Sequence, residues 1–339
     1  MTTTLAAVAA PFGRDLDACF ARIDELLTDA RARGVQLLAL PEAALGGYLA
    51  DLVPPAGSPP RISTAQLPAG RTGEPPEYVQ YEGRPAGTPS ENLDPPISAT
   101  DSRRGALGDH GVKRVLPRDA LPPALDVDGP EIARLARMAG DVVVTAGFCE
   151  SDGTSRYNTV VAVTGDGVLG VHRKVHQPLG ESNSYAAGDR FCAFDSPVGR
   201  LGMLICYDKA FPEAARTLAL DGAEIIVCVS AWPAARTAAS PDLAEDRWTH
   251  RFDLFDRARA LENQVVWVAS NQSGTFGSLR FVCSAKVVGP GGDVLATTGV
   301  APGMAVADVD VPAVLAGARR SMAHLRDRRP ETYGVPTGV

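Results

Sequence analysis

Short apolar runs alternate along this chain with segments whose apolar residues recur every three or four positions. The clearest helical pattern covers residues 15–31, whose apolar side chains fall on one face, between strand-like runs near Ala6 and Leu38. The same criteria predict helices at residues 130–139, 212–220 and 247–263, and strands at residues 142–148, 159–164, 168–172, 201–205, 225–229, 265–269, 281–288 and 294–298. This alternation predicts an α/β domain with layered strands inside and amphipathic helices outside.

A proline-rich segment interrupts the alternation at about residues 54–123. It contains five Pro-Pro pairs and few apolar residues in phase, which excludes a regular helix or sheet. Two interpretations stay open: a loosely ordered surface insertion, or a lid or oligomer contact beside the strand edge that it leaves. Chain length alone would allow two domains, but the elements on both sides of the insertion predict a single domain over residues 1–339.

The composition is that of an ordinary globular protein, with 45% hydrophobic and 22% charged residues among 339. A formal net charge of -7 argues against nucleic acid and membrane partners, because both select basic protein faces. No apolar run is long enough to span a bilayer, and residues 5–10 lack the basic segment that precedes a signal core. The six cysteines are scattered without paired spacing, which favours reduced thiols and a cytoplasmic location.

Cys206 stands at a predicted junction between a buried strand, residues 201–205, and a helix that begins near Pro212. A nucleophile is useful there because the sheet holds it rigidly while nearby backbone amides can stabilise an oxyanion. The alternative is that Cys206 is only a small hydrophobic core residue, which is the commonest fate of a free cysteine.

Two charged residues stand at the ends of other strand-like runs. Glu42 follows residues 37–40, and Lys174 follows residues 168–171 within a His-Arg-Lys-Val-His segment. A carboxylate or an ammonium at the end of a buried strand costs solvation free energy unless it is paired or has a function. Glu42, Lys174 and Cys206 therefore form a candidate catalytic set in that chain order.

This ordered set resembles the nitrilase superfamily of carbon-nitrogen hydrolases. The main matching motifs are Leu40-Pro41-Glu42 with Gly47-Tyr48, His172-Arg173-Lys174-Val175-His176, and Cys206-Tyr207-Asp208 with Phe211-Pro212-Glu213. Lesser matches are Gly147-Phe148-Cys149-Glu150, Tyr157-Asn158, Arg259-Ala260-Leu261-Glu262-Asn263 and Asp327-Arg328-Arg329-Pro330-Glu331. The resemblance implies a four-layer αββα sandwich, in which two sheets face each other between two layers of helices.

The resemblance also implies roles for the site residues. Cys206 is expected to be the nucleophile, Glu42 the base that takes its proton, and Lys174 the cation that favours the thiolate and the oxyanion. A second glutamate that orients the lysine corresponds best to Glu181, and Glu150 is the alternative for a supporting carboxylate. No step of this chemistry needs a cofactor or a metal.

Further side chains at the same sheet edge are candidates for substrate binding. Tyr48, Tyr207 and Trp232 are expected to line the pocket, and packing alone is the competing interpretation for each. His172 and His176 have the spacing of two zinc ligands on a helix, but their segment is predicted to end a strand and lacks an obvious third ligand. We therefore expect no metal site.

The residues after the cysteine indicate the reaction, because Cys-Tyr-Asp before Phe-Pro-Glu resembles the amidase-type branches, whereas nitrilases usually carry Cys-Trp-Glu. The leading expectation is an amidase that cleaves a small linear amide through a thioester on Cys206 and releases ammonia. An N-carbamoyl amide hydrolase or a nitrilase is the alternative, and a non-catalytic scaffold is a second one. The resemblance further implies a homodimer or larger homo-oligomer, with a C-terminal tail at about residues 304–339 packed on a partner subunit.

Overall fold

The computed structural model describes residues 2–51 and 121–334, so the predicted insertion at about 54–123 lies almost wholly outside the described residues. In the described part, twelve strands are joined by hydrogen bonds and two more form a small hairpin. The twelve strands are β1 (Thr3–Ala10), β2 (Leu37–Ala39), β3 (Val143–Ser151), β4 (Arg156–Thr164), β5 (Gly167–Arg173), β6 (Phe194–Ser196), β7 (Gly199–Ile205), β8 (Ile225–Ser230), β9 (Val266–Gln272), β12 (Lys286–Val288), β13 (Val294–Thr297) and β14 (Gly303–Val309). The hairpin consists of β10 (Thr275–Phe276) and β11 (Leu279–Arg280).

The helices lie between these strands in the chain. They are α1 (Leu16–Ala32), α2 (Pro130–Ala139), α3 (Pro212–Leu220), α4 (Arg247–Asn263) and α5 (Val311–Ser321), with short 3-10 helices that include η3 (Glu181–Asn183) and η4 (Cys206–Ala210). The predicted bounds of α2, α3 and α4 are those of the structure, and α1 is displaced by one residue. None of the helices in the described ranges is long and apolar enough to cross a membrane.

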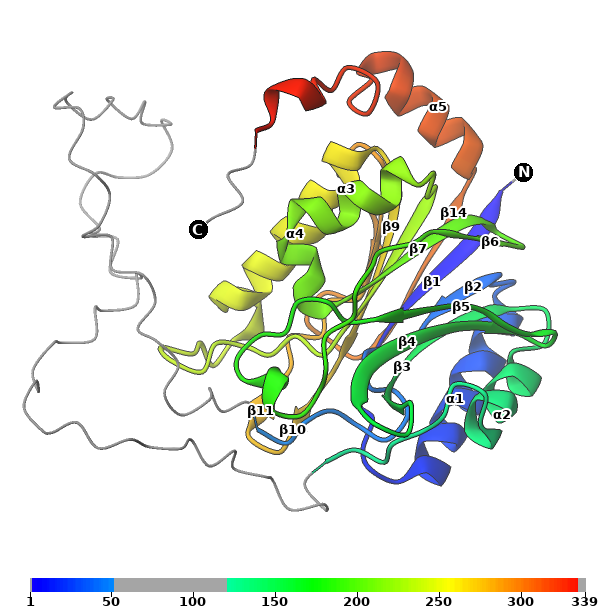
Figure 1. Ribbon diagram of the computed structural model, residues 1–339, viewed down its shortest axis with the longest axis vertical. Helices are drawn as coiled ribbons and strands as arrows, with labels where there is room; N and C mark the ends of the chain where they lie inside the picture. Colours follow the sequence, from blue (N-terminus) through cyan, green and yellow to red (C-terminus); the bar gives the residue numbers. More distant parts are fainter. Residues whose placement is uncertain (1, 52–120, 335–339) are drawn as a thin grey trace, which may run out of the picture. The chain divides into compact units, whose positions relative to one another are not determined.

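The strands form two halves that face each other. One half has the order β5-β4-β3-β2-β1-β14 and the other β6-β7-β8-β9-β12-β13. Among the described strands, the two halves pair through their backbones only where the ends of β1 and β9 meet. β3 lies against β8 and β4 against β7, while α1 and α2 cover one outer face and α3 and α4 the other (Figure 1). This arrangement confirms the predicted four-layer αββα sandwich.

The alternation of side chains along a strand explains why both faces of each half are apolar. In β1, Leu5, Ala7 and Ala9 pack in the central layer, whereas Ala6 and Val8 pack against α1 and α2. All five are fully buried. A strand between two apolar layers therefore appears in the sequence as an uninterrupted apolar run.

The direction of the strands determines where the site forms. β1 is parallel to β2 and β9, β2 is parallel to β3, and β8 is parallel to β7 and β9, while β4 is antiparallel to both β3 and β5. The carboxyl ends of β2, β5, β7 and β8 therefore lie at one edge, which is where open α/β sheets bind their ligands.

Two predictions about the C-terminal half need correction. The strand expected at residues 281–288 begins only at Lys286, because Cys283 and Ser284 have φ angles of 62° and 57° and left-handed residues interrupt a strand. The segment that starts at residue 304 was expected to be a tail on a partner subunit. Its first residues instead belong to β14, which pairs with β1 of the same chain.

Candidate active site

Four segments that follow strands meet at the carboxyl edge of the sandwich. Glu42 follows β2, Lys174 follows β5, Cys206 follows β7 and Ala231 follows β8. The side chains of Glu42 and Lys174 are fully buried, and Cys206 is 4% exposed. The structure thus brings together the three residues that the sequence placed at the ends of separate strands.

The Lys174 ammonium lies between two buried carboxylates. Its Nζ is 3.0 Å from Glu42 Oε1 and 2.8 Å from Glu181 Oε2. Burial acts to lower the pKa of Lys174, but the two carboxylates outweigh it and hold that pKa well above its ordinary value. Burial raises the pKa of Glu181, and Lys174 opposes this. The lysine is therefore a fixed positive charge in the interior of the site.

Further hydrogen bonds orient these carboxylates. Asn158 on β4 donates through Nδ2 to Glu42 Oε1 at 2.6 Å and to Glu181 Oε1 at 3.1 Å. The Ala231 amide donates to Glu42 Oε2 at 2.5 Å, and the Tyr48 hydroxyl donates to Glu181. Asn158 was not among the predicted site residues, although the Tyr157-Asn158 pair was one of the lesser motif matches in the sequence.

The Cys206 thiol occupies a strained turn beside these groups. Cys206 is the first residue of η4 and has a φ of 50°, in a left-handed region that non-glycine residues seldom adopt. Burial and the neighbouring Glu42 raise the pKa of the thiol well above its ordinary value, and Lys174 lowers it to a smaller extent. The resting thiol is therefore protonated and needs a base before it can act as a nucleophile.

Asp208 links the cysteine turn to the lysine segment. Its Oδ2 lies 3.0 Å from His172 Nε2 and accepts the Ile205 amide, while its Oδ1 accepts the His176 amide and lies 2.9 Å from the His176 ring. The two histidines that flank Lys174 thus bind a carboxylate two residues after Cys206. Within residues 2–51 and 121–334 there is no group of three or more His, Cys, Asp or Glu side chains that could hold a metal ion.

The structure separates the two candidate supporting carboxylates. Glu150 binds Arg173 through both oxygens and accepts a hydrogen bond from Thr159 at 2.7 Å. Glu181 is the carboxylate that contacts Lys174. The supporting position beside the lysine is therefore occupied by Glu181.

The three predicted substrate-binding residues have different surroundings. Tyr48 contacts Glu181 and stacks edge-on against Phe281, with ring centroids 6.4 Å apart. Tyr207 is partly buried against Phe211. Trp232 packs against aromatic residues of α4 at centroid distances of 5.8 to 6.0 Å, namely Trp248, Phe252 and Phe255. Tyr48 is thus the one of the three that has a described hydrogen bond to the Glu-Lys cluster.

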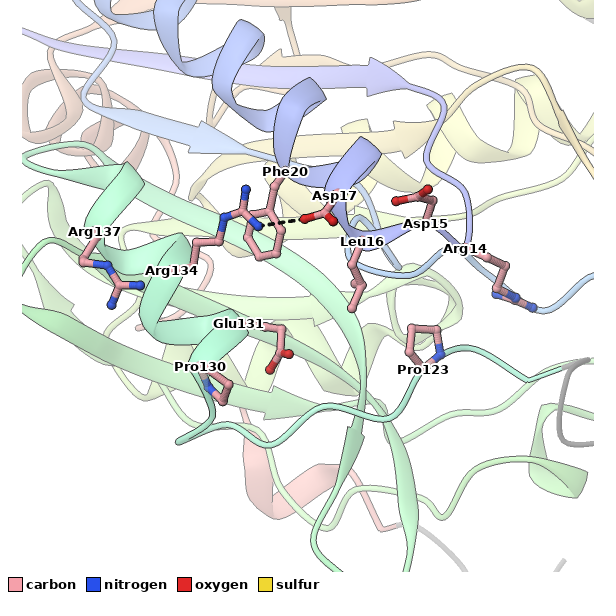
Figure 2. Close-up of a pocket in the computed structure, with 10 residues that line it drawn as sticks. All are labelled: Arg14, Asp15, Leu16, Asp17, Phe20, Pro123, Pro130, Glu131, Arg134 and Arg137. Atoms are coloured by element: carbon pink, nitrogen blue, oxygen red, sulfur yellow. Dashed lines mark hydrogen bonds and ion pairs between the residues drawn. The ribbon is translucent and has the colours of Figure 1, made fainter.

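A surface groove of about 600 Å³ lies between α1 and α2 and contains none of these residues (Figure 2). Three acidic and three basic side chains line it, and Arg134 is paired with Asp17 at 3.1 Å. The same guanidinium lies 4.1 Å from the centre of the Phe20 ring. The lining of the groove therefore has no excess of one charge that would indicate a charged substrate.

Comparison with known proteins identifies the family, since residues 4–319 match the sequence profile of the carbon-nitrogen hydrolase family. The chain belongs to the carbon-nitrogen hydrolase family. This hydrolase-family chain is 34% identical over 174 residues to a probable nitrilase from Schizosaccharomyces pombe, and the match covers 50% of the chain and 60% of that relative. It is 32% identical to N-carbamoylputrescine amidase from Arabidopsis thaliana, over 61% of the chain and 73% of that relative.

Solved structures of the nitrilase superfamily share the fold of this carbon-nitrogen hydrolase family member. A carbon-nitrogen hydrolase from Helicobacter pylori G27 matches with a TM-score of 0.68 at 20% identity and covers 98% of this chain and 97% of its own. A mutant of an amidase from Nesterenkonia AN1 matches with a TM-score of 0.63 at 20% identity, over 97% and 95% of the two chains. At this level of identity the likeness shows the nitrilase-type fold.

Proposed function

We propose that this chain is an amidase that hydrolyses a small linear carboxamide to a carboxylic acid and ammonia. The observation that carries the proposal is the buried Lys174 ammonium, which the Glu42 and Glu181 carboxylates hold beside the Cys206 thiol. A thiol, a carboxylate and an ammonium in one buried site supply the nucleophile, the proton carrier and the oxyanion partner that amide hydrolysis needs.

The first half of the reaction forms a thioester. Glu42 takes the thiol proton as Cys206 Sγ attacks the carbonyl carbon, and the carbonyl oxygen becomes an oxyanion stabilised by Lys174 and a backbone amide near Tyr207. Glu42 then returns the proton to the amide nitrogen, the carbon-nitrogen bond breaks, and ammonia leaves. The pKa of the thiol, which burial raises, makes the transfer to Glu42 a requirement for attack.

The second half releases the acid. Glu42 takes a proton from water while the water oxygen attacks the thioester carbon, and the carbon-sulfur bond then breaks. The proton on Glu42 returns to Cys206 Sγ, which restores the enzyme. Glu181, Tyr48 and Asn158 keep Lys174 and Glu42 in place through both halves.

Two solved structures of the Nesterenkonia sp. AN1 amidase support this choice of substrate class. One mutant carries the acetamide moiety of fluoroacetamide added covalently at its active-site cysteine, and another is a complex with butyramide. Both molecules are short, unbranched carboxamides. We expect the corresponding covalent adduct to form at Cys206 of this chain.

The test is ammonia release from a panel of small amides, measured with the unaltered chain and with Cys206→Ala, Lys174→Ala and Glu42→Gln. We expect each change to lower turnover by about 100-fold or more, since each removes a group that acts in the chemical steps. Glu150→Gln is the matched control, because Glu150 is also a buried carboxylate paired with a cation but does not contact Lys174. Turnover that survives Cys206→Ala would refute the nucleophile. No turnover of any substrate would favour a non-catalytic scaffold.

A second candidate substrate class is the N-carbamoyl amines, favoured by the 32% identity to N-carbamoylputrescine amidase. Hydrolysis of such a substrate at the same site releases carbon dioxide together with ammonia, whereas a simple carboxamide leaves a carboxylate. Measuring both gases for each substrate therefore separates the two classes. A nitrile in the same panel tests the third class, because its complete hydrolysis also ends in a carboxylate and ammonia.

We expect the chain to form a homodimer or a larger homo-oligomer. Exposed leucines lie on the outer helices: Leu254 is 66% and Leu261 47% exposed on α4, and Leu220 is 50% exposed at the end of α3. The two α4 leucines are seven residues apart and so lie on one helix face. Leu254→Glu is expected to dissociate the assembly in sedimentation equilibrium, while Val294→Glu on β13 should leave it intact. An unchanged mass for both variants would show that the α4 face with Leu254 and Leu261 is not the subunit interface.

A cytoplasmic location and the absence of nucleic acid and membrane partners stay proposals as well. Their support is the net charge of -7 and the six cysteines, which are all free thiols. Fractionation of cells that produce the chain, with detection in the cytoplasmic fraction only, is the expected result.

A further inference from the structure

A second buried charged cluster lies on α4, outside the Glu-Lys-Cys site. Asp256 Oδ1 accepts hydrogen bonds from Lys209 Nζ at 2.7 Å and from Trp267 Nε1 at 2.9 Å, and its Oδ2 accepts one from Lys286 Nζ at 2.9 Å. Asp256 and Lys209 are fully buried, and Lys286 is 2% exposed. Burying three charges is expensive even when they are paired, and apolar residues of the same volume often stabilise a core better. The cluster therefore calls for an explanation other than packing.

On one side, the cluster contacts the turn that carries Cys206. Lys209 belongs to η4, the 3-10 turn whose first residue is Cys206. On the same turn, Arg259 of α4 donates to the Lys209 carbonyl at 2.8 Å and to the Ala210 carbonyl at 3.2 Å. Asp256 and Arg259 thus attach α4 to both the side chain and the backbone of the turn. The left-handed φ of Cys206 needs such support, because surrounding contacts must hold a strained residue in place.

On the other side, the cluster contacts the segment before β12, which leads to Phe281 and Tyr48 beside the site. Lys286 Nζ donates to the Ser284 carbonyl at 2.7 Å, within the pair of left-handed residues that precedes β12. Three residues before Ser284, the Phe281 ring packs edge-on against Tyr48. Tyr48 in turn donates to Glu181, the carboxylate beside the catalytic lysine. Asp256 is therefore connected on one side to the cysteine turn and on the other to the aromatic support of the lysine.

We propose that Asp256, with Lys209 and Lys286, is a positioning cluster that holds the Cys206 turn in register with the wall formed by Phe281 and Tyr48. The proposal rests on the proposed role of Cys206 as the nucleophile. The three residues touch no reacting atom and act only through the two backbone segments that they fasten. Their loss is expected to slow attack by the thiol more than it weakens substrate binding.

Lys209→Met is the most informative variant. It keeps an unbranched side chain against the Phe252 ring, over which the Lys209 ammonium now lies at 3.0 Å from the ring centre. Asp256 retains the hydrogen bonds from Lys286 and Trp267, so the remaining carboxylate is still paired. Ile23→Ala on α1 is the control for lost stability, because Ile23 is fully buried in the helix layer on the other side of the sandwich.

Two readouts are measured below the unfolding temperature of each variant. The first is kcat and KM for the best amide. The second is the rate at which iodoacetamide alkylates Cys206, with the modified residue located by mass spectrometry. We expect Lys209→Met to lower kcat by at least about tenfold with KM within about threefold, and to change the alkylation rate, because a small displacement of a nucleophile has a large kinetic cost. Ile23→Ala is expected to leave both readouts within about twofold.

The outcomes separate this proposal from the proposed function. If Lys209→Met keeps kcat and the alkylation rate of the control variant, the cluster is structural only and the positioning role is wrong. If the unaltered chain hydrolyses no amide in the panel, the proposed substrate is wrong, and the alkylation rates alone decide the positioning role. If Lys209→Met does not fold, Arg259→Lys is the second variant. It weakens the hydrogen bonds from residue 259 to the η4 backbone while keeping the charge, and it is expected to show the same loss of kcat. Unchanged kinetics in that variant would also refute the role.

Discussion

Replacing Asp208 with asparagine perturbs the link between the cysteine turn and the lysine segment. In the native chain Oδ1 accepts the His176 amide at 2.9 Å, and Oδ2 accepts the Ile205 amide at 3.2 Å and faces the His172 ring at 3.0 Å. Asp208→Asn keeps only one acceptor oxygen. An NH2 group takes the place of the other oxygen, and it cannot accept the hydrogen bond from the Ile205 amide. One side of the link is therefore lost together with the negative charge.

The expected size of the effect follows from the bonds that disappear. Hydrogen bonds to a charged group contribute about 1.5–3 kcal/mol each, and a buried donor left without a partner adds to the loss. Two such bonds end on Oδ2, so the free energy of unfolding should fall by about 3–6 kcal/mol. That is a large share of the roughly 5–15 kcal/mol that stabilises a typical domain.

The effect should also depend on pH with a definite sign. Although burial acts to raise it, the hydrogen bonds from His172 and His176 hold the pKa of Asp208 below its ordinary value. A carboxyl group whose pKa is lowered in the folded state contributes stability above its unfolded pKa of about 3.9 and loses it as the pH falls toward the folded value. The difference between the unaltered chain and Asp208→Asn should thus be full at neutral pH and shrink below about pH 4.

Urea unfolding followed by tryptophan fluorescence at several pH values measures this difference. Asp189→Asn serves as the control, because the Asp189 side chain is 81% exposed and its loss should change stability by less than about 0.5 kcal/mol. A loss below about 1 kcal/mol for Asp208→Asn at pH 7 would refute the reasoning. So would a loss of the full size that stays constant down to pH 3.

Four further outcomes are expected. A Cβ atom on Gly147 would lie 2.6 Å from the Cα of Glu42, so Gly147→Ala should lower the urea midpoint by the equivalent of about 1–3 kcal/mol and reduce ammonia release; an unchanged midpoint would show that this approach tolerates a methyl group. Because Cys206 has a left-handed φ, the free energy of unfolding of Cys206→Gly in urea should equal or exceed that of Cys206→Ala, by up to about 1 kcal/mol. The opposite order would exclude backbone strain at this residue. Since burial raises the pKa of the Cys206 thiol, its alkylation rate should still be rising at pH 9, and a plateau below pH 8 would contradict this. Tyr48→Phe removes the donor to Glu181 and should lower kcat by about tenfold, whereas a change in KM alone would assign Tyr48 to substrate binding.

The sequence by itself predicted the alternation of helices and strands and three of the residues that meet in the candidate site. The helical period over residues 15–31 and the apolar run at β1 are local consequences of burial on one face or on two, so they can be recognised without knowing the neighbours. Glu42, Lys174 and Cys206 could be found in the same way. Glu42 and Lys174 come shortly after apolar runs, where burying a charge costs solvation free energy unless the charge is paired or has a function, and Cys206 follows the strand predicted at residues 201–205.

Only the tertiary structure decided which partners these residues have. Asn158 reaches Glu42 across 116 positions of the chain, and Asp256 joins Lys209 across 47 positions. The same holds for the choice of Glu181 over Glu150 beside Lys174 and for the pairing of β14 with β1. The physical reason is that the cost of burying a polar group depends on the partner that satisfies it. That partner arrives from a distant segment, and no local pattern in the chain specifies where it will be.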